Sequence, residues 1–404
     1  MTCLEVFNTS LDHVTIQWTD NLQEIDSQWS ISDDQPVLIS LPYLRGLAET
    51  KPEGMELHYG LILKSNKIIG LVLCQVIGFD AERRLKIQIE TGQAATLSDK
   101  IALAIKLFVA RKVKVYAAII GNLMTAGPYG FYFLPEISET ERSRIMVELC
   151  KVVLDHNTIF KKSQVVVIKD LPSSSRIPGS NCKLYSRLNE FTIQPSMCMR
   201  IEPAWDNMDR YLNDLESKYR LKIRNALAKS EDLQVVDADV DAISLYNSEI
   251  YALYREVAES AGFNLVDLHP EYLLGIKRKV GNSFAVKLIF GKGQLIGFYS
   301  YFYDNGYMNA HFVGYRKNLN KQYHLYHNIL LYYLKDALAL KCKNIEFART
   351  ALEMKSSLGA SPVDYYCYLS HGSRFVNHLV PKILEMLKPV EVWQPRSPFK
   401  AKTV

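Results

Sequence analysis

Side chains that bind anions or move protons gather in one stretch of the chain, residues 307–366, close to where strands and helices are predicted to end. These side chains are His311, Tyr323, His324, Glu346, Arg349, Thr350 and Lys355. In open α/β sheets, ligands lie outside the carboxyl ends of the strands. The stretch therefore predicts a functional site at that edge of a sheet.

Three of these residues are candidate general bases. The pKa of histidine lies nearest to neutral, which suits His311 and His324, and Glu346 is the third candidate. Two of them also have a structural interpretation: His311 stands in mid-strand between apolar neighbours, as buried histidines do, and Glu346 can simply be the outward face of its strand. His324 and His327 are three residues apart, but no further ligand spacing accompanies them, so no metal site is expected.

The end of the predicted strand 344–348 carries a cation. A guanidinium there is costly unless it is paired. Arg349, followed by Thr350, therefore either binds a ligand carboxylate or phosphate, or pairs with an acidic residue such as Glu353 or Asp364. Lys355 is a candidate for anion binding, and its alternative is an ordinary exposed lysine.

A basic run precedes this stretch within a predicted helix or pair of helices. It comprises Lys218, Arg220, Lys222, Arg224 and Lys229. On a helix Arg220 and Arg224 lie one turn apart and share a face. They are candidates for clamping a phosphate of a nucleotide-linked substrate, a lipid headgroup or tRNA. The alternative is a solvated helix face.

The elements that carry these residues form a repeated pattern. The segments GLILKSNKIIGLVLCQV and VKLIFGKGQLIGFYSYF both read as hairpins, and Gly70 corresponds to Gly297. Each hairpin is followed by a strand (307–315 in the second copy), a long helix (about 320–341) and a buried strand. The pattern predicts a duplication and two similar α/β domains.

Further boundaries follow from composition. Residues 1–55 are predicted to be a helical entry, 97–113 a helix and 185–199 one strand, with a linker at 173–181. The loop Gly127–Gly130 is interpreted either as a wall of a cleft between domains or as simple turn chemistry. The predicted domains are 1–180, the N-terminal copy, and 181–392, the C-terminal copy with the site. Residues 393–404 are predicted to be a flexible tail.

The bulk properties narrow the class of protein. The 404 residues carry a net charge of +5, and the seven cysteines include no CxxC pair, so neither a zinc site nor a disulfide framework is expected. The N-terminus lacks the pattern of a signal peptide, and no apolar run reaches the roughly 18 residues that span a bilayer. We expect a cytoplasmic protein with at most peripheral membrane contact. The balanced charge and the lack of a recognition motif argue against DNA as a partner.

Three segments resemble a known superfamily. They are YLNDLESKYRLKIRNALAKS, QLIGFYSYF and ARTALEMKSSLGASPVDYY. Together with the order of elements, they resemble GNAT acyltransferases of the tandem, FemAB-like branch that serves peptidoglycan biosynthesis. The resemblance implies an α/β (α+β) fold of two GNAT-like domains, each a mixed, mostly antiparallel sheet flanked by helices. The first copy is expected to be degenerate and to shape the cleft.

The resemblance also implies a reaction. An acyl or aminoacyl group would move from a thioester or ester donor to a small-molecule amine, without a covalent enzyme intermediate. Strand-edge N–H groups would polarise the carbonyl, and the pyrophosphate of coenzyme A would sit on the helix that follows the fourth strand. The corresponding turn, RKNLNKQYHLYHN, has no glycine. The expected donors are therefore acyl-CoA, an acyl-carrier protein or aminoacyl-tRNA.

One alternative function is open at this point. In it, the chain is a non-catalytic GNAT-like module that recognises an anionic cell-envelope or lipid intermediate. The absence of a glycine cradle favours this alternative.

Overall fold

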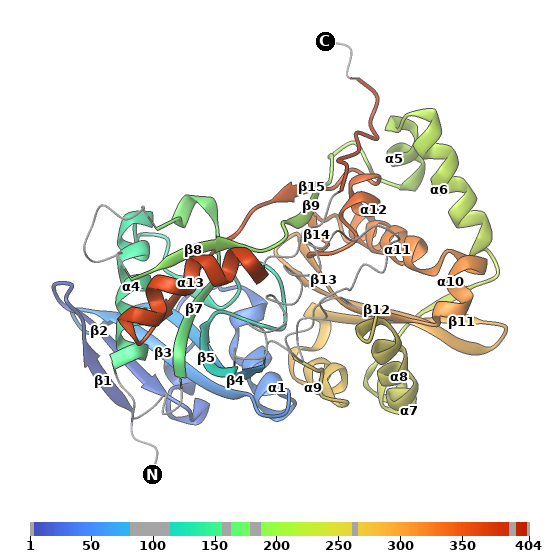
Figure 1. Ribbon diagram of the computed structural model, residues 1–404. Coiled ribbons are helices and arrows are strands. Elements are labelled where there is room, and N and C mark those ends of the chain that lie inside the picture. Colours follow the sequence, from blue (N-terminus) through green and yellow to red (C-terminus); the bar gives the residue numbers. More distant parts are fainter. Residues whose placement is uncertain are drawn as a thin grey trace, which may run out of the picture.

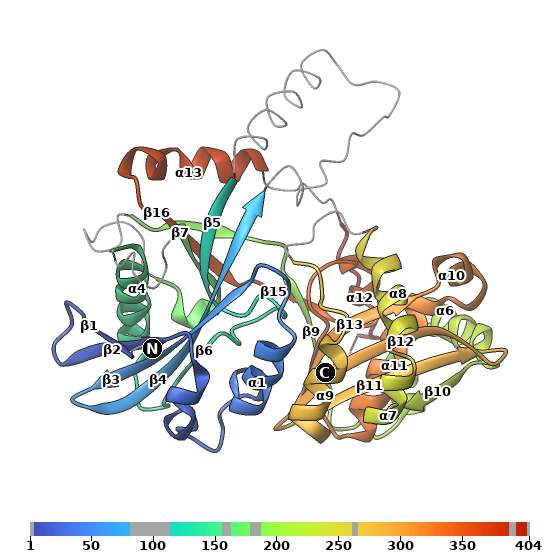
Figure 2. The same ribbon diagram turned by 90° about the horizontal axis from the view of Figure 1, so that it is seen from below.

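Two mixed β-sheets lie side by side, each flanked by helices, in a computed structural model that describes residues 4–80, 114–155, 163–177, 187–260, 266–387 and 393–401 (Figures 1 and 2). The predicted mixed α/β class with two sheets is confirmed. The helix predicted at 97–113 lies outside the described residues.

The first sheet contains one parallel pair among its described strands, β5 with β7. Its order is β1 (Glu5–Asn8), β2 (Val14–Thr19), β3 (Glu56–Lys64), β4 (Lys67–Asp80), β5 (Lys114–Ile120), β7 (Ser163–Leu171), β16 (Tyr366–His371) and β8 (Asn189–Thr192), and β6 (Phe131–Phe133) pairs with β4. Its helices are α1 (Leu41–Glu49), α4 (Glu139–Asp155) and α13 (Arg374–Leu387).

The second sheet repeats this plan, with β13 and β14 as its parallel pair. Its order is β10 (Gln234–Asp237), β11 (Phe284–Gly291), β12 (Gln294–Asp304), β13 (Tyr307–Tyr315), β14 (Asn344–Glu346), β9 (Ser196–Arg200) and β15 (Ser361–Val363). Its helices are α5 (Met208–Asp214), α6 (Ser217–Lys229), α7 (Val240–Leu245), α8 (Asn247–Ala258), α9 (Tyr272–Val280), α10 (Lys317–Tyr323), α11 (Leu325–Ala339) and α12 (Leu352–Ser356).

The duplication extends to one irregularity in each hairpin. In β3–β4, Ile62 faces Gly70 and the register then shifts by one residue. In β11–β12, Ile289 faces Gly297 and the register shifts at the same place. A β-bulge of this kind bends and twists the strand. The Ile-Gly pair that aligned the two hairpins in the sequence therefore marks the same bulge in both.

The two halves exchange strands. The segment predicted as one strand, 185–199, is two strands in different sheets, because β8 joins the first sheet and β9 the second. The chain returns in the same way, since β15 pairs with β9 and β16 with β7 and β8. Figure 1 shows this ribbon between the halves. The sheets therefore do not follow the predicted boundary at residue 180, because β16 and α13 lie with the first half.

The N-terminal prediction differs from the structure. The chain begins with the hairpin β1–β2, and α1 is the one α-helix among described residues 4–55. The reason is the spacing of the apolar residues. Val14, Ile16 and Trp18 occupy every second position of β2 and are all buried, as expected for a strand.

The tail is also ordered where the structure describes it, at 393–401. Phe399 stacks on Trp205 at a centroid distance of 5.2 Å. The Glu216 N–H donates to the Pro398 carbonyl at 2.8 Å. The expected flexible tail is therefore a packed segment of the second half over these residues.

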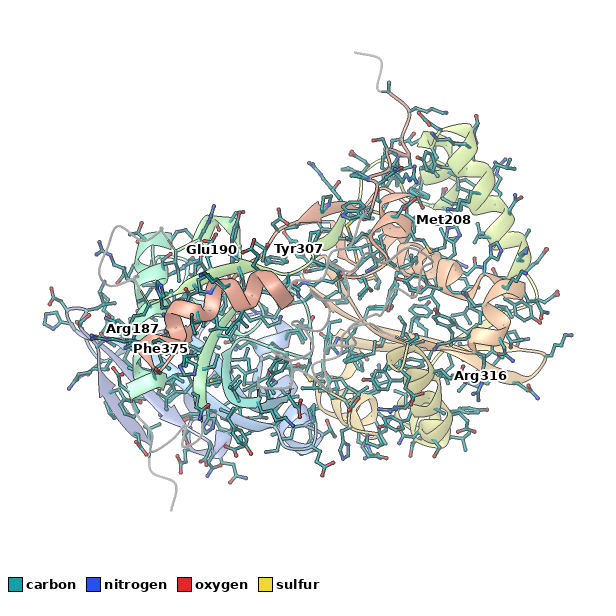
Figure 3. All side chains as sticks on the ribbon, viewed as in Figure 1. Arg187, Glu190, Met208, Tyr307, Arg316 and Phe375 are labelled. Carbon is teal, nitrogen blue, oxygen red and sulfur yellow. The ribbon has the colours of Figure 1, made fainter. Side chains whose placement is uncertain are left out.

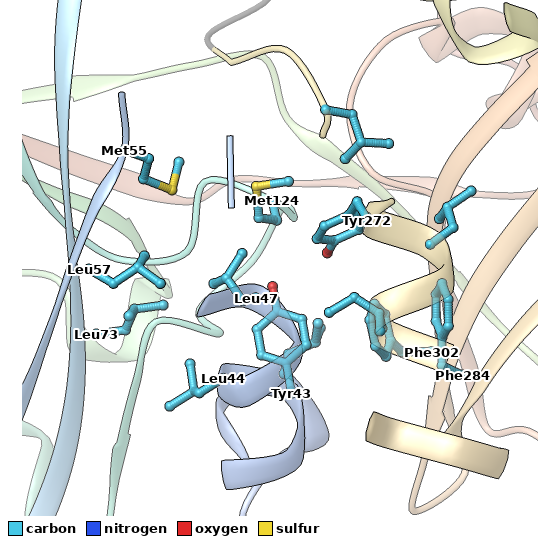
Figure 4. Close-up of a cluster of buried hydrophobic side chains, with 14 of the residues drawn as sticks. Tyr43, Leu44, Leu47, Met55, Leu57, Leu73, Met124, Tyr272, Phe284 and Phe302 are labelled. Atoms are coloured by element: carbon cyan, nitrogen blue, oxygen red, sulfur yellow. The ribbon is translucent and has the colours of Figure 1, made fainter. Parts of the chain in front are cut away.

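A continuous apolar core joins the halves through α1 and α9 (Figure 4). The two helices cross where each carries a glycine. A Cβ on Gly275 would lie 2.5 Å from Thr50 Cγ2, and one on Gly46 would lie 3.0 Å from Ile276 Cδ1. The close crossing depends on the missing side chains.

We expect Gly275→Val to destabilise the protein by about 1–3 kcal/mol, because overpacking forces the two helices apart. Urea unfolding measures this change. Gly78→Val is the control, since the nearest atom to a Cβ there is 3.6 Å away. Equal midpoints for the two variants would contradict the close crossing.

Candidate active site

The carboxylate of Asp170, at the end of β7, is completely buried between the two halves. It pairs with Lys169 of the same strand and with Arg349, which follows β14 of the other sheet. It also accepts a hydrogen bond from the Gly127 N–H at 3.0 Å. Burial alone would raise the pKa of Asp170, but the charges of Lys169 and Arg349 hold it below its usual value.

Arg349 is therefore a paired cation of the interface. Its Nη2 donates to Asp170, and its Nε donates to the Gln194 carbonyl at 2.8 Å. The predicted partner Glu353 pairs instead with Arg396 at the surface. Thr350 is exposed in the left-handed region, with φ +70°.

Lys355 supports the loop that holds Arg349. Its ammonium donates to three successive carbonyls, those of Phe347 at 2.7 Å, Ala348 at 3.0 Å and Arg349 at 2.7 Å. The side chain is not the exposed lysine of one sequence interpretation, because only 2% of the residue is accessible. Burial lowers its pKa to about 7. In the structure Lys355 fixes the strand end, and its ammonium is fully occupied there.

Glu346, the last residue of β14, is a buried candidate base, with 9% of the residue accessible. Its Oε1 accepts from Ser196 Oγ at 2.8 Å and its Oε2 from the Tyr129 hydroxyl at 3.2 Å. Burial, together with the nearby Asp170 carboxylate, raises the pKa of Glu346 above its usual value. It is therefore a stronger base than an ordinary glutamate.

Tyr129 connects Glu346 to a cleft of about 630 Å³. The cleft is lined from the first half by Asp33, Asp34, Pro36, Val37, Leu38 and Tyr129, and from the second by Phe302, Asp304, Asn305, Tyr307, Asn309 and Lys343. Figure 3 shows Tyr307 at the junction of the halves. Three carboxylates against one lysine make this cleft suited to a cationic ligand.

His311 lies elsewhere, in an aromatic setting. Its Nε2 is 3.0 Å from the Tyr272 hydroxyl, and the Tyr272 and Tyr43 hydroxyls point toward each other between α9 and α1 (Figure 4). Phe302, a wall of the cleft, packs on the imidazole at 4.9 Å. Burial lowers the pKa of His311 to about 3, so it is neutral and a weak base.

Tyr323 and His324 lie in a third place. The predicted helix 320–341 is interrupted, since His324 adopts φ +47° between α10 and α11. Asn328 Nδ2 satisfies the carbonyl that the break frees, donating to Tyr323 O at 2.8 Å. Tyr323 is buried, and Arg224 and Arg220 lie on α6, exposed and half-buried respectively. The structure thus brings Glu346, Arg349 and Lys355 together but not the histidines or the α6 arginines.

The start of α10 does not fit a pyrophosphate. Glu256 of α8 lies there, accepting from the Lys317 N–H at 3.1 Å and pairing with Arg316. Figure 3 shows Arg316 far from Tyr307, at the other end of the second half. A carboxylate at a helix start takes the place that an anionic ligand would take.

The backbone N–H that the resemblance predicts to polarise a thioester carbonyl also has a hydrogen-bond partner within the chain. A bulge in β13 leaves Phe312 without a strand partner, and its N–H donates to Ser300 Oγ at 3.1 Å. Both elements of a coenzyme A site are therefore occupied by the chain's own side chains, and the residues present do not fit that cofactor in its usual place.

Neither a cluster of metal ligands nor a membrane-spanning helix is found in the part of the chain that the structure describes. Nowhere in it do three or more His, Cys, Asp or Glu side chains come together as metal ligands. None of its helices is both long and apolar enough to cross a membrane.

Solved structures show the same architecture. No protein-family model and no curated protein matches the chain. FemX matches with a TM-score of 0.50 and 10% identity over 95% of this chain and 100% of that chain. The chain has a GNAT-type fold, which it shares with FemX. This confirms the predicted fold class of two tandem domains.

Two other solved structures match with lower TM-scores. The tandem GNAT protein from the clavulanic acid biosynthesis pathway has a TM-score of 0.43 and 12% identity, over 91% of this chain and 99% of that chain. L-PGS from Bacillus licheniformis has a TM-score of 0.43 and 11% identity, over 88% of this chain and 98% of that chain.

The sequence did not reveal Asp170, Ser196 and Asn309 as residues of the site or of its cleft. The sequence did carry one signal for Asp170. Lys169-Asp170 ends a buried strand of the first copy, and Arg349-Thr350 follows the corresponding strand of the second copy. Asp170 adopts φ +61°, which the sequence does not indicate. The loop Gly127–Gly130 does line the cleft, through Tyr129.

Arg349→Met should destabilise the protein by about 3–5 kcal/mol at pH 7, because it leaves a buried carboxylate with one cation fewer. The Asp170 pKa is held low in the folded state, so its contribution is present above the unfolded pKa of about 3.9 and is lost as pH falls. We therefore expect the difference from wild type in urea unfolding to shrink as the pH falls below about 4.

Arg396→Met is the matched control, since Arg396 pairs with the half-exposed Glu353. It should cost much less than Arg349→Met, because solvent screens an exposed ion pair. A similar cost for both arginines, or a difference that does not depend on pH, would be incompatible with the buried pair.

Proposed function

We propose that the protein is an N-acyltransferase that moves an acyl or aminoacyl group from a thioester or ester donor to an amine. The supporting observation is the buried Glu346, which Tyr129 links to an acidic cleft between the two halves of a GNAT-type fold. The cleft suits an amine acceptor, because Asp33, Asp34 and Asp304 attract an ammonium.

Glu346 is the base in this proposal. The bound ammonium first releases one proton to the solvent, which leaves a neutral amine. As this amine attacks, its proton passes to the Tyr129 oxygen and the Tyr129 proton passes to Glu346, which the 3.2 Å hydrogen bond permits. The amine nitrogen attacks the donor carbonyl, a C–N bond forms and the C–S or C–O bond breaks. The proton returns along the same path to the leaving thiolate or alkoxide, so the protein ends unchanged.

The donor is proposed to be carried by a macromolecule, an acyl-carrier protein or tRNA. Glu256 at the start of α10 and Ser300 at the β13 bulge disfavour free acyl-CoA.

Glu346→Gln should lower turnover by about 10²–10⁴-fold, because the base is lost while the hydrogen bonds to Ser196 and Tyr129 remain possible. The assay pairs acyl-CoA, acyl-carrier and aminoacyl-tRNA donors with a panel of amines. Glu353→Gln is the control and should retain activity. No turnover by wild type with any pair, or full activity of Glu346→Gln, would refute the proposal.

A second candidate is a non-catalytic module that binds an anionic cell-envelope or lipid intermediate. One observation favours this function. Glu256 accepts from the N–H at the start of α10, where the phosphate of an acyl donor would otherwise bind. Under this function, Arg220→Ala with Arg224→Ala should abolish binding to anionic lipid vesicles. Vesicle binding that these substitutions leave intact would exclude recognition through the α6 arginines.

A further inference from the structure

A second cavity, of about 260 Å³, lies in the second half of the protein, on the other face of β12 from the acidic cleft. Successive residues of a strand point to opposite faces of a sheet. Phe302 and Asp304 line the acidic cleft, whereas Tyr301 and Tyr303 line this cavity together with α11. Figure 1 shows α11 beside β12. The two sites therefore share a strand but no residue.

Four charged side chains line the cavity, two of each sign. Asp237 at the end of β10 pairs with Lys287 of β11 at 3.0 Å. Two groups are left over, Lys277 of α9 and Asp336 of α11. Among the residues that the structure describes, neither of them forms an ion pair. The same cavity thus receives one ammonium and one carboxylate that lack a close counter-charge.

Both of these groups are held in place by one hydrogen bond and can form more. Lys277 Nζ donates to the Phe284 carbonyl at 2.7 Å, which uses one of its three donors. Asp336 Oδ2 accepts from the Tyr299 hydroxyl at 2.9 Å, and a carboxylate can accept about four hydrogen bonds. Burial lowers the pKa of Lys277 and raises that of Asp336, in agreement with two charges that lack close partners.

The remaining walls suit a small organic molecule. Tyr301, which is 5% exposed, and Tyr303 provide aromatic side chains, which attract an ammonium and also pack against alkyl groups. Ala339 and Leu340 of α11 add apolar surface. The cavity is smaller than most sites for drug-sized ligands, so its ligand must be small.

We propose that this cavity binds a free α-amino acid with a neutral side chain. The ammonium of the amino acid pairs with Asp336, its carboxylate pairs with Lys277, and its side chain lies against Leu340. A zwitterion brings one charge of each sign, so both unpaired groups gain a partner and the cavity stays neutral. A ligand with a single charge would leave one of them unpaired. This site lies apart from the acyl-transfer cleft and does not depend on the proposed function.

The first test uses the wild-type protein and needs no substitution. Calorimetry measures the binding of glycine, L-alanine, L-serine, L-leucine and L-methionine at millimolar concentration. We expect at least one of them to bind. The amine that lacks its carboxylate and the acid that lacks its ammonium should each bind at least about tenfold more weakly, because each leaves one charge of the cavity unpaired. No binding by any of the five, or equal binding of the amine or the acid, would overturn the proposal.

The second test places the ligand in this cavity. Asp336→Asn and Lys277→Gln should each weaken binding at least about tenfold, and both new side chains can keep the hydrogen bonds to Tyr299 and to the Phe284 carbonyl. Thermal unfolding checks that each variant is folded. Asp33→Asn is the matched control, since it removes a carboxylate of the acidic cleft, and it should change binding by less than about twofold.

The control also separates the two sites. Equal weakening by Asp33→Asn would assign the amino acid to the acidic cleft and overturn this proposal. Amino-acid binding that depends on Asp336 and Lys277, in a protein without any turnover, would support this cavity while refuting the transferase function.

Discussion

A buried carboxylate must be balanced, and the balance around Asp170 holds the two halves of this protein together. A charge without solvent is costly unless cations and N–H donors surround it. Lys169 comes from the same strand, but Arg349 comes from the end of β14 in the other sheet. Arg349 in turn lies in a loop whose carbonyl oxygens accept hydrogen bonds from Lys355. The relative position of the two strand ends is therefore fixed by electrostatics as well as by the apolar core.

This arrangement separates the properties of two neighbouring carboxylates. Asp170 has two cations and stays ionised, whereas Glu346 has hydroxyl donors, and burial raises its pKa. Environments that drive two pKa values apart are the usual way in which a protein assigns different roles to like groups. Here one carboxylate is suited to structure and the other to proton transfer. The separation depends on the paired halves, since Tyr129 and Ser196 reach Glu346 from different elements.

Local pattern accounts for what the sequence predicted. Strand 307–315 and the Ile-Gly bulges at Gly70 and Gly297 arise from neighbours in the chain, so periodicity and residue type reveal them. The exchanged strand β16 and the Arg349–Asp170 pair join residues more than 170 positions apart, and no local signal encodes such partners. His311 illustrates the same limit, because its position in a strand was predictable but the aromatic rings around it come from α9, β11 and β12.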